Sequence, residues 1–227
     1  MVVTGTRKGI GRDVAMHYLA AGWIVIGASR GDATIESEDY HHYTLDVGDE
    51  IAVKRMFTES RQRFGRVDAL VNNAGIAAMN HALLTPADTV RRINDTNFVG
   101  TFLCCREAAK LMRRHRSGRI VNFTSVAVPL ALEGESAYAA SKAAVVMLSQ
   151  VLARELAPHG ITVNVVGPGP VKTDMTSSLP EQKMEQLLTR LPLGRYTETS
   201  EITNVIDFFL RPESGGVSGQ IIYLGGV

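Results

Sequence analysis

Residues 4–11 read Thr4-Gly5-Thr6-Arg7-Lys8-Gly9-Ile10-Gly11, between a short apolar run at Val2-Val3 and a segment with helical periodicity. Glycines at such a point allow a tight turn and let the backbone approach a ligand closely. The helix that follows presents free N–H groups and the positive end of its dipole, which together attract phosphate. An ordinary glycine turn contains the same residues, so the position between a strand and a helix is what predicts a dinucleotide-binding turn.

Apolar, β-rich runs of strand length alternate with helical segments along the rest of the chain. The predicted strands lie at Val2-Val3, Ile24 to Ile26, Val67 to Val71, Ile120 to Phe123, Ile161 to Val166 and Ile221 to Leu224. The predicted helices are Gly11 to Ala21, Asp49 to Phe64, Asp95 to Arg114, Ser136 to Ala157, Pro180 to Thr189 and Thr199 to Leu210. This alternation predicts an α/β fold, with a parallel sheet covered by helices on both faces.

One connection is too short for this scheme. Between the second strand, ending near Ser29, and a further sheet segment near Tyr43 to Val47 lies only the polar stretch Arg30 to His42. A full crossover helix needs more residues and an apolar face, so we expect a loop or about one helical turn there.

The composition excludes several classes of protein. The 227 residues carry 24 Lys and Arg against 23 Asp and Glu, so no overall charge favours nucleic acid or an anionic membrane. Cys104 and Cys105 are adjacent, which argues against a disulfide framework. No apolar run approaches the ~18 residues of a membrane span, and the N-terminus does not resemble a signal peptide. We therefore expect one soluble, cytoplasmic domain over 1–227, with a small substrate-side segment at about 173–195 and no metal ion.

The end of the second strand predicts which dinucleotide binds. An acidic residue there accepts hydrogen bonds from a free ribose 2′-hydroxyl, whereas a basic one tolerates a 2′-phosphate. The strand ends Ala28-Ser29-Arg30, and Lys8 adds positive charge beside the same pocket. Arg30 is otherwise a solvated loop residue, and Asp32 offsets it, but the pattern favours NADP(H), with NAD(H) as the alternative.

Asn97, Ser125, Tyr138 and Lys142 form the strongest functional pattern. Tyr138 and Lys142 are four residues apart in a predicted helix, so their side chains share one face. Ser125 follows an apolar strand at the edge of the sheet where ligands bind. Taken singly, Ser125 reads as a cap or loop residue, Tyr138 as an amphipathic helix residue and Asn97 as a local backbone partner. Together, after a phosphate-binding turn, they predict a catalytic site.

Carbonyl reduction by hydride needs these residue types. Negative charge develops on the substrate oxygen, and a free phenol with a pKa near ~10 is a poor proton donor and acceptor at neutral pH. A neighbouring ammonium, supplied by Lys142, and the positive nicotinamide ring of the oxidised cofactor would lower the pKa of Tyr138. Ser125 would donate a hydrogen bond to the same oxygen.

The ordered motifs resemble those of the short-chain dehydrogenase/reductase family over nearly the whole chain. They are Thr-Gly-x-x-x-Gly-Ile-Gly at 4–11, Asp46-Val47, Asn72-Asn73-Ala74-Gly75, Asn97, Ser125, Tyr138-x-x-x-Lys142 and Asn164 to Pro168-Gly169. The resemblance implies a single Rossmann-type, doubly wound sheet of about seven strands in the order 3-2-1-4-5-6-7. It implies a catalytic tetrad of Asn97, Ser125, Tyr138 and Lys142, with Lys142 also on the nicotinamide ribose and Asn97 supporting a proton relay through water.

The resemblance also implies adenine contacts near Asp46 and Val47, ribose contacts near Asn73 to Gly75 and nicotinamide contacts from Pro168 to Thr173. With the turn, the expected cofactor-binding residues are Gly5, Arg7, Lys8, Gly9, Ile10, Gly11, Arg30, Asp46, Val47, Asn73, Ala74, Gly75, Tyr138, Lys142, Pro168, Gly169, Val171 and Thr173. The shortened segment Arg30 to His42 departs from the family and trims the adenine side of this site.

Within the family the chain most resembles the 3-oxoacyl-[acyl carrier protein] reductases, in Ile161 to Val166, Thr173 to Thr176 and Pro192 to Arg195. The expected reaction is NADP(H)-dependent reduction of a 3-oxoacyl thioester, carried on acyl carrier protein or coenzyme A. Dehydrogenation of a small cyclic diol, sugar or steroid-like alcohol is the alternative. A non-catalytic dinucleotide-binding scaffold or redox sensor is the alternative of another class.

Two expectations concern partners. Arg113, Arg114, His115, Arg116 and Arg119 form a basic cluster that would receive an acidic carrier protein, or that simply complements a helix C-terminus. His159 stands where the carrier-dependent reductases place a second docking arginine, which weakens the first interpretation. The resemblance also implies a homotetramer, and the apolar residues Val145, Val146, Leu148, Val151 and Leu152 nearly encircle part of the catalytic helix.

Overall fold

The computed structural model describes residues 1–177 and 181–227. They form a parallel sheet of seven strands in the order β3-β2-β1-β4-β5-β6-β7, as predicted. The strands are β1 (Val2–Thr4), β2 (Val25–Ser29), β3 (Tyr40–Thr44), β4 (Ala69–Asn72), β5 (Gly118–Phe123), β6 (Ile161–Gly167) and β7 (Ile221–Tyr223). All seven residues of β6, including the polar Thr162 and Asn164, are buried, as expected for a strand covered on both faces.

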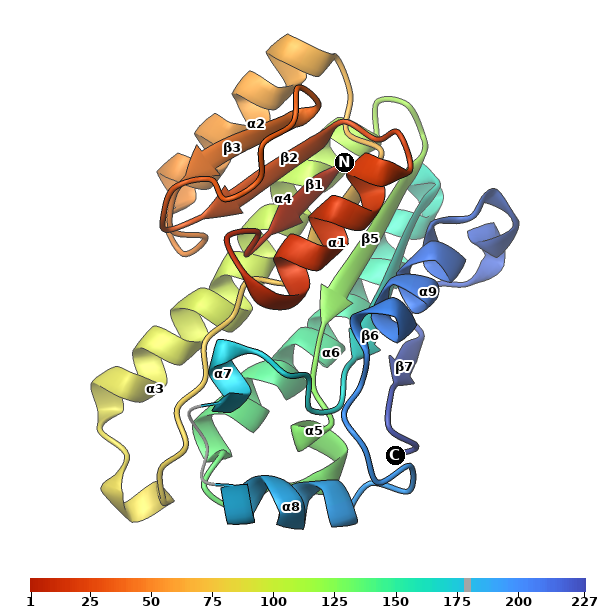
Figure 1. Cartoon of the computed structure of the whole chain (residues 1–227). Coiled ribbons are helices and arrows are strands. Elements are labelled where there is room, and N and C mark those ends of the chain that lie inside the picture. The colour runs from red at the N-terminus through yellow and green to blue at the C-terminus, as the bar shows by residue number, and fades with distance from the viewer. Residues whose placement is uncertain (178–180) are drawn as a thin grey trace.

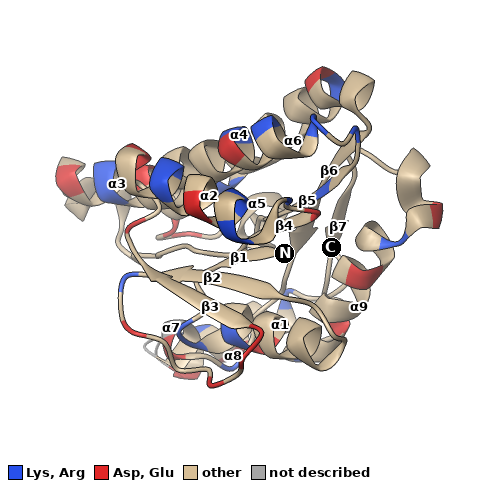
Figure 2. Ribbon diagram, turned by 90° about the horizontal axis from the view of Figure 1, so that it is seen from above, with Lys and Arg blue, Asp and Glu red and all other residues tan. Residues whose placement is uncertain are grey.

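Helices cover both faces of the sheet (Figure 1). They are α1 (Gly9–Ala20), α2 (Glu50–Phe64), α3 (Ala87–Asn94), α4 (Gly100–Met112), α5 (Ala127–Leu130), α6 (Ser136–Leu156), α7 (Asp174–Ser177), α8 (Glu181–Thr189) and α9 (Thr199–Leu210). Seen from above, α2, α4 and α6 lie on one side of the sheet and α1 and α9 on the other (Figure 2). Each layer encloses its own apolar core, and both cores share the alternating side chains of the strands.

The predicted helix boundaries hold to within a few residues, with one exception. Helix α9 has the predicted bounds, and Asp49 caps α2 by accepting from the N–H groups of Ile51 and Ala52. The start predicted for α8, Pro180, lies outside the described residues. The helix predicted from Asp95 in fact begins at Ala87, because α3 precedes a π-helical turn at Asp95–Val99 that continues into α4. Most of α3 is exposed, and Val90 and Ile93 are its only large apolar residues, too few to mark a separate helix in the sequence.

The third strand was misplaced by the sequence reading. It spans Tyr40–Thr44 rather than a segment near Tyr43 to Val47, because its tyrosine, histidine and threonine side chains do not form an apolar run. The short connection before it contains no helix, as predicted, and its Ile35 is buried in the core beside α1.

One helical stretch, Ser136–His159, is long and apolar enough to cross a membrane, which the sequence reading did not expect. In the structure its α6 part packs on β6 and buries Ser141, Lys142, Val145, Ser149 and Ala153. The core helices of layered proteins pass the same test of length and composition, and this helix covers the sheet in that way.

Candidate active site

Two adjoining cavities lie at the carboxyl ends of the strands. Because every strand pairing is parallel, these ends share one edge of the sheet. The turn cavity, of about 380 Å³, is lined by residues 5–10 and by the ends of β2 and β4. The deep cavity, of about 640 Å³, is lined by the ends of β5 and β6, by α6 and by α8. Gly75 and Arg30 border both, so a long ligand can extend from one cavity into the other.

The turn between β1 and α1 has the geometry that its glycines predict. Gly5 and Gly9 have positive φ angles of 79° and 58°, which only glycine adopts without strain. A Cβ at Gly11 would collide with the carbonyl of Gly5, so Gly11 allows the close packing of turn and helix. Lys8 precedes α1 and makes no side-chain cap, so the first N–H groups of the helix keep their capacity to bind a ligand.

Two polar contacts tie the loop after β4 to this turn. Asn73 Nδ2 donates to the carbonyl oxygen of Thr4 at 3.0 Å, and the N–H of Ala74 donates to Thr4 Oγ1 at 3.0 Å. The loop that borders both cavities is therefore fixed to the phosphate-binding turn. The sequence placed Thr4 in the turn but gave it no part in fixing the loop after β4, because that role depends on the pairing of β1 with β4.

The basic residues at the turn cavity differ in how they are paired. Lys8 Nζ lies 2.6 Å from Asp174 Oδ2, so an exposed ion pair offsets the charge that the sequence reading assigned to Lys8. Arg30 borders both cavities, and Arg7 lines the turn cavity with its guanidinium against Gly31. Arg7 and Arg30 therefore supply positive charge at the end of β2.

Ser125, Tyr138 and Lys142 lie together on the wall of the deep cavity. Ser125 follows β5, whereas Tyr138 and Lys142 lie one turn apart on α6. The Lys142 ammonium is 6.0 Å from the centroid of the Tyr138 ring and donates to the carbonyl oxygen of Phe123 at 3.0 Å. Phe123 is buried at the end of β5 and lines the same cavity, so this contact anchors the lysine in the cavity wall.

The pKa values of this pair are governed by burial. Burial raises the pKa of Tyr138 to about 12, with a hydrogen bond to Ser125 acting against the rise and the charge of Glu135 adding to it. Burial lowers the pKa of Lys142 to about 8. The lowering of the phenol pKa that the sequence predicts is therefore not seen in the protein alone, because burial raises the pKa of Tyr138 more than its polar contacts lower it.

Asn97 does not line either cavity. Its side chain is fully buried in the π-helical turn, where Nδ2 donates to Ile76 O at 2.9 Å and to Ser141 Oγ at 3.0 Å. Its Oδ1 accepts from the N–H of Ile76 at 2.8 Å. Asn97 therefore fixes the backbone of the loop after β4 and joins it to α6, while its part in a proton relay through water stays a prediction.

The structure brings most of the predicted site residues together. The turn cavity or the deep cavity is bordered by Gly5, Arg7, Lys8, Gly9, Ile10, Arg30, Asp46, Val47, Asn73, Ala74, Gly75, Ser125, Tyr138, Lys142, Pro168, Gly169, Val171 and Thr173. Gly11 and Asn97 lie behind the cavity walls. Over residues 1–177 and 181–227, no three His, Cys, Asp or Glu side chains are placed to hold a metal ion.

Two residues beside Tyr138, of which only Glu135 lines the deep cavity, were missed. Glu135 lines it one turn before Tyr138, and burial raises the pKa of its carboxyl group. Ser141 bridges Asn97 and the carbonyl oxygen of Tyr138. The spacing of Glu135 and Ser141 from Tyr138, three residues on either side, was the available signal, since such positions share a helix face.

Comparison with known proteins gives a consistent result. A family model described as Enoyl-(Acyl carrier protein) reductase matches residues 5–226. The 3-oxoacyl-[acyl-carrier-protein] reductase FabG of Staphylococcus aureus is 36% identical over 99% of this chain and 96% of that protein. The enzyme of the same name from Salmonella typhimurium is 34% identical over 99% and 95%.

Two solved structures show the same architecture. ElxO with NADP bound superposes with a TM-score of 0.90 at 28% identity, covering 98% of this chain and 95% of that chain. Ligand-free aldohexose dehydrogenase of Thermoplasma acidophilum superposes with a TM-score of 0.90 at 30% identity, covering 99% and 92%.

Proposed function

The chain belongs to the short-chain dehydrogenase/reductase family, and on that premise we propose that it is an NADP(H)-dependent reductase of 3-oxoacyl thioesters. The observation that carries this proposal is the convergence of Ser125, Tyr138 and Lys142 in a cavity continuous with a phosphate-binding turn. A relative of 36% identity that is named a 3-oxoacyl-[acyl-carrier-protein] reductase supports the choice of substrate.

The residues present fit a nicotinamide dinucleotide. The turn offers uncapped helix N–H groups, and the glycines leave space where a side chain would intrude. A Cβ built on Gly75 would lie 3.3 Å from Lys142 Nζ, so the ammonium borders the path between the two cavities. When bound, the dinucleotide supplies hydride to a carbonyl carbon or accepts it from an alcohol.

The protein's own groups manage the proton. Tyr138 gives its phenolic proton to the oxygen of the substrate during reduction and takes it back during oxidation. Ser125 donates a hydrogen bond to the same oxygen and so stabilises the charge that develops there. Lys142 is held in the cavity wall by Phe123, where its charge stabilises the phenolate formed when Tyr138 has given up its proton.

The preference for NADP(H) rests on Arg7 and Arg30. Both guanidinium groups lie at the turn cavity, close to the end of β2 where a ribose 2′-phosphate is recognised in this kind of fold. The structural relative with NADP bound supports the same cofactor. Lys8 contributes less than the sequence suggested, because Asp174 pairs with it.

The walls of the deep cavity fit an acyl chain. Away from Tyr138 they are mainly apolar, through Ile76, Ala77, Ala78, Met79, Leu132, Met184 and Leu187. Such a surface accommodates the alkyl part of a 3-oxoacyl thioester. The basic cluster proposed for carrier docking precedes β5, so it lies at the edge of the sheet opposite the cavity. Coenzyme A thioesters therefore make the more direct first test.

A sugar or another polyol is the second candidate substrate. Glu135 lines the deep cavity beside Tyr138, and a carboxylate accepts hydrogen bonds from hydroxyl groups. The structural likeness to an aldohexose dehydrogenase points the same way.

A substrate screen followed by absorbance of NADPH and NADH separates these candidates. We expect oxidation of NADPH with acetoacetyl-coenzyme A, and little activity with NADH or with sugars, cyclic diols and steroid alcohols. Oxidation of an aldohexose in the absence of thioester turnover would instead establish the second candidate. No turnover with any ketone or alcohol would favour a non-catalytic dinucleotide-binding scaffold.

A further inference from the structure

A chain of hydrogen-bonded side chains links the phosphate-binding turn to the connection between β2 and β3. Thr6 Oγ1 lies 2.7 Å from the Tyr40 hydroxyl, which lies 2.8 Å from His42 Nδ1. His42 Nε2 lies 2.9 Å from the carbonyl oxygen of Gly31 and 3.2 Å from Ser29 Oγ. The chain thus begins in the phosphate-binding turn and ends in the turn that follows β2.

The direction of these hydrogen bonds follows from the chemistry of their ends. The carbonyl of Gly31 can only accept, so His42 carries its ring proton on Nε2. Nδ1 of His42 then accepts from the Tyr40 hydroxyl, and the oxygen of Tyr40 accepts from Thr6. Every proton in the chain has an acceptor, so the network has one consistent arrangement and holds its two ends at a fixed separation.

The two ends carry the arginines of the turn cavity. Arg7 follows Thr6 directly, and Arg30 lies between Ser29 and Gly31. The guanidinium of Arg7 rests against Gly31, where a Cβ would lie 2.6 Å from Nη1. A shift of the Gly31 turn relative to Thr6 would therefore change the spacing of the two guanidinium groups.

Besides this chain, side-chain contacts of Ser29, Thr34 and Ile35 hold the connection, and Ser29 Oγ donates to the carbonyl oxygen of Gly31 at 2.9 Å. Residues 31–39 contain no helix, so no helical hydrogen bonds stiffen the turn. Ile35 anchors the middle of this connection in the core, and Thr34 Oγ1 donates to the carbonyl of Arg7 at 2.6 Å. Tyr40 can reach Thr6 because Gly27 of β2 has no side chain; a Cβ at Gly27 would collide with the Tyr40 ring.

We propose that Tyr40 and His42 are positioning residues that fix Arg7 and Arg30 for the 2′-phosphate, and so determine the preference for NADP(H) over NAD(H). This inference rests on the proposed use of NADP(H). In place of a crossover helix, the hydrogen-bonded chain fixes the turn after β2 relative to the phosphate-binding turn. Neither side chain lines the turn cavity, so their effect on a ligand passes through the arginines.

Tyr40→Phe tests the proposal, because it removes the hydroxyl and keeps the ring on Gly27. We expect the Kd for NADP⁺, measured by calorimetry, to rise about three- to tenfold, as for the loss of one or two hydrogen bonds. The Kd for NAD⁺, which has no 2′-phosphate, should change less than about twofold. The matched control is Tyr43→Phe, which removes a hydroxyl from the same strand on the opposite face of the sheet.

His42→Phe provides a second variant, with His41→Phe as its control. His41 is the neighbouring imidazole and lies against Phe64, away from the turn. We expect the ratio of the two Kd values to move toward one in His42→Phe and to stay at the wild-type value in His41→Phe. A merely structural role would lower the melting temperature and leave this ratio unchanged.

An unchanged ratio in folded Tyr40→Phe and His42→Phe would overturn the inference while leaving the proposed function intact. A wild-type protein that binds NAD⁺ as tightly as NADP⁺, or neither, would instead contradict the cofactor assignment on which the inference rests.

Discussion

Lys142 holds its amino group inside the protein at 5% exposure, and burial lowers its pKa to about 8 from an ordinary 10.5. Between these values the unfolded chain binds a proton that the folded chain has released, so stability rises with pH across this window. Below a pH of about 8 the lysine is charged in both states, so the folded state carries the full free-energy cost of burying that charge. The residue that catalysis requires therefore destabilises the fold at neutral pH.

Lys142→Met should consequently raise the free energy of unfolding near pH 7 by about 1–3 kcal/mol while abolishing turnover. The gain should shrink as the pH rises from about 8 toward 10.5, because the folded wild-type protein then holds the lysine uncharged and no longer buries a charge. Urea unfolding near pH 7 and pH 10 measures both effects. Lys54→Met, on the exposed face of α2, should show neither effect, and a Lys142→Met protein less stable than wild type near pH 7 would contradict the argument.

Sequence reasoning succeeded at single residues where chemistry and spacing agreed, and failed where partners come from distant segments. Ser125, Tyr138 and Lys142 share the expected cavity. Asn97 does not, because the π-helical turn directs its side chain to Ile76 and Ser141 instead. The ion pair between Lys8 and Asp174 joins residues far apart in the chain, so no local sequence pattern could predict it.

At the level of elements, α9 shows how a helix start is stabilised. Glu198 and Glu201 form a reciprocal capping box, and Arg195 pairs with Glu201 through Nη1 and Nη2, both at 2.8 Å. The hydrogen bond from Arg195 is the main reason why the pKa of Glu201 falls to about 2 from 4.5. A lowered carboxyl pKa contributes stability that is complete above the unfolded value and is lost as the pH falls through the folded value.

Glu201→Ala should lower the free energy of unfolding by about 1 kcal/mol near pH 7, a modest figure because the pair is partly exposed. The difference from wild type should disappear as the pH falls from about 4.5 toward 2. Thermal melts over this range measure it, with Glu155→Ala on the exposed side of α6 as the control. A deficit that persists in full near pH 2 would show that packing, rather than the charged cap, is responsible.

Helices and strands were predicted best where the burial of one face gives the sequence a regular spacing of apolar residues. The strands β4, β5 and β6 and the helices α2, α6 and α9 fall within a few residues of their predicted bounds. The β3 strand and the α3 helix were misplaced because they are polar or aromatic and lie at the periphery of the fold. The hydrogen-bonded chain through Tyr40 and His42 could not be foreseen, because it depends on the register of β3 against β2.

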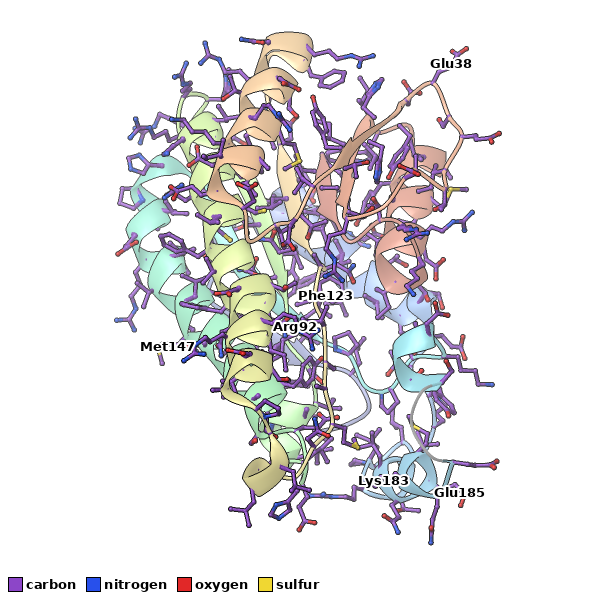
Figure 3. All side chains as sticks on the ribbon, turned by 90° about the vertical axis from the view of Figure 1, so that its left-hand side faces the viewer. Glu38, Arg92, Phe123, Met147, Lys183 and Glu185 are labelled. Carbon is purple, nitrogen blue, oxygen red and sulfur yellow. The ribbon has the colours of Figure 1, made fainter. Side chains whose placement is uncertain are left out.

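At the scale of the whole molecule, alternation along the chain predicted a parallel sheet and the family resemblance gave its strand order, but the sequence of one chain does not determine how chains assemble. Helices α4 and α6 present exposed apolar side chains, including Phe102, Met147 and Val151. Figure 3 shows Met147 pointing away from the body of the protein. Such a surface is typical of a contact between subunits.

We therefore predict a homotetramer, with a light-scattering mass four times the 24.6 kDa of the chain. Val151→Glu should reduce that mass, because it places a charge among apolar side chains that would be buried at the contact. Leu83→Glu, at an exposed leucine of the short turn Ala82–Leu84 rather than on α4 or α6, should leave it unchanged. A monomeric wild-type protein at micromolar concentration would contradict the prediction.

The central claim, that Tyr138 transfers the proton in a hydride-transfer reaction, is tested most directly by Tyr138→Phe. The variant should lose about 10²–10⁴-fold in kcat while its Kd for NADP⁺ stays within about twofold of wild type, because only the phenolic oxygen is removed. Turnover of the variant at the wild-type rate would contradict the assignment.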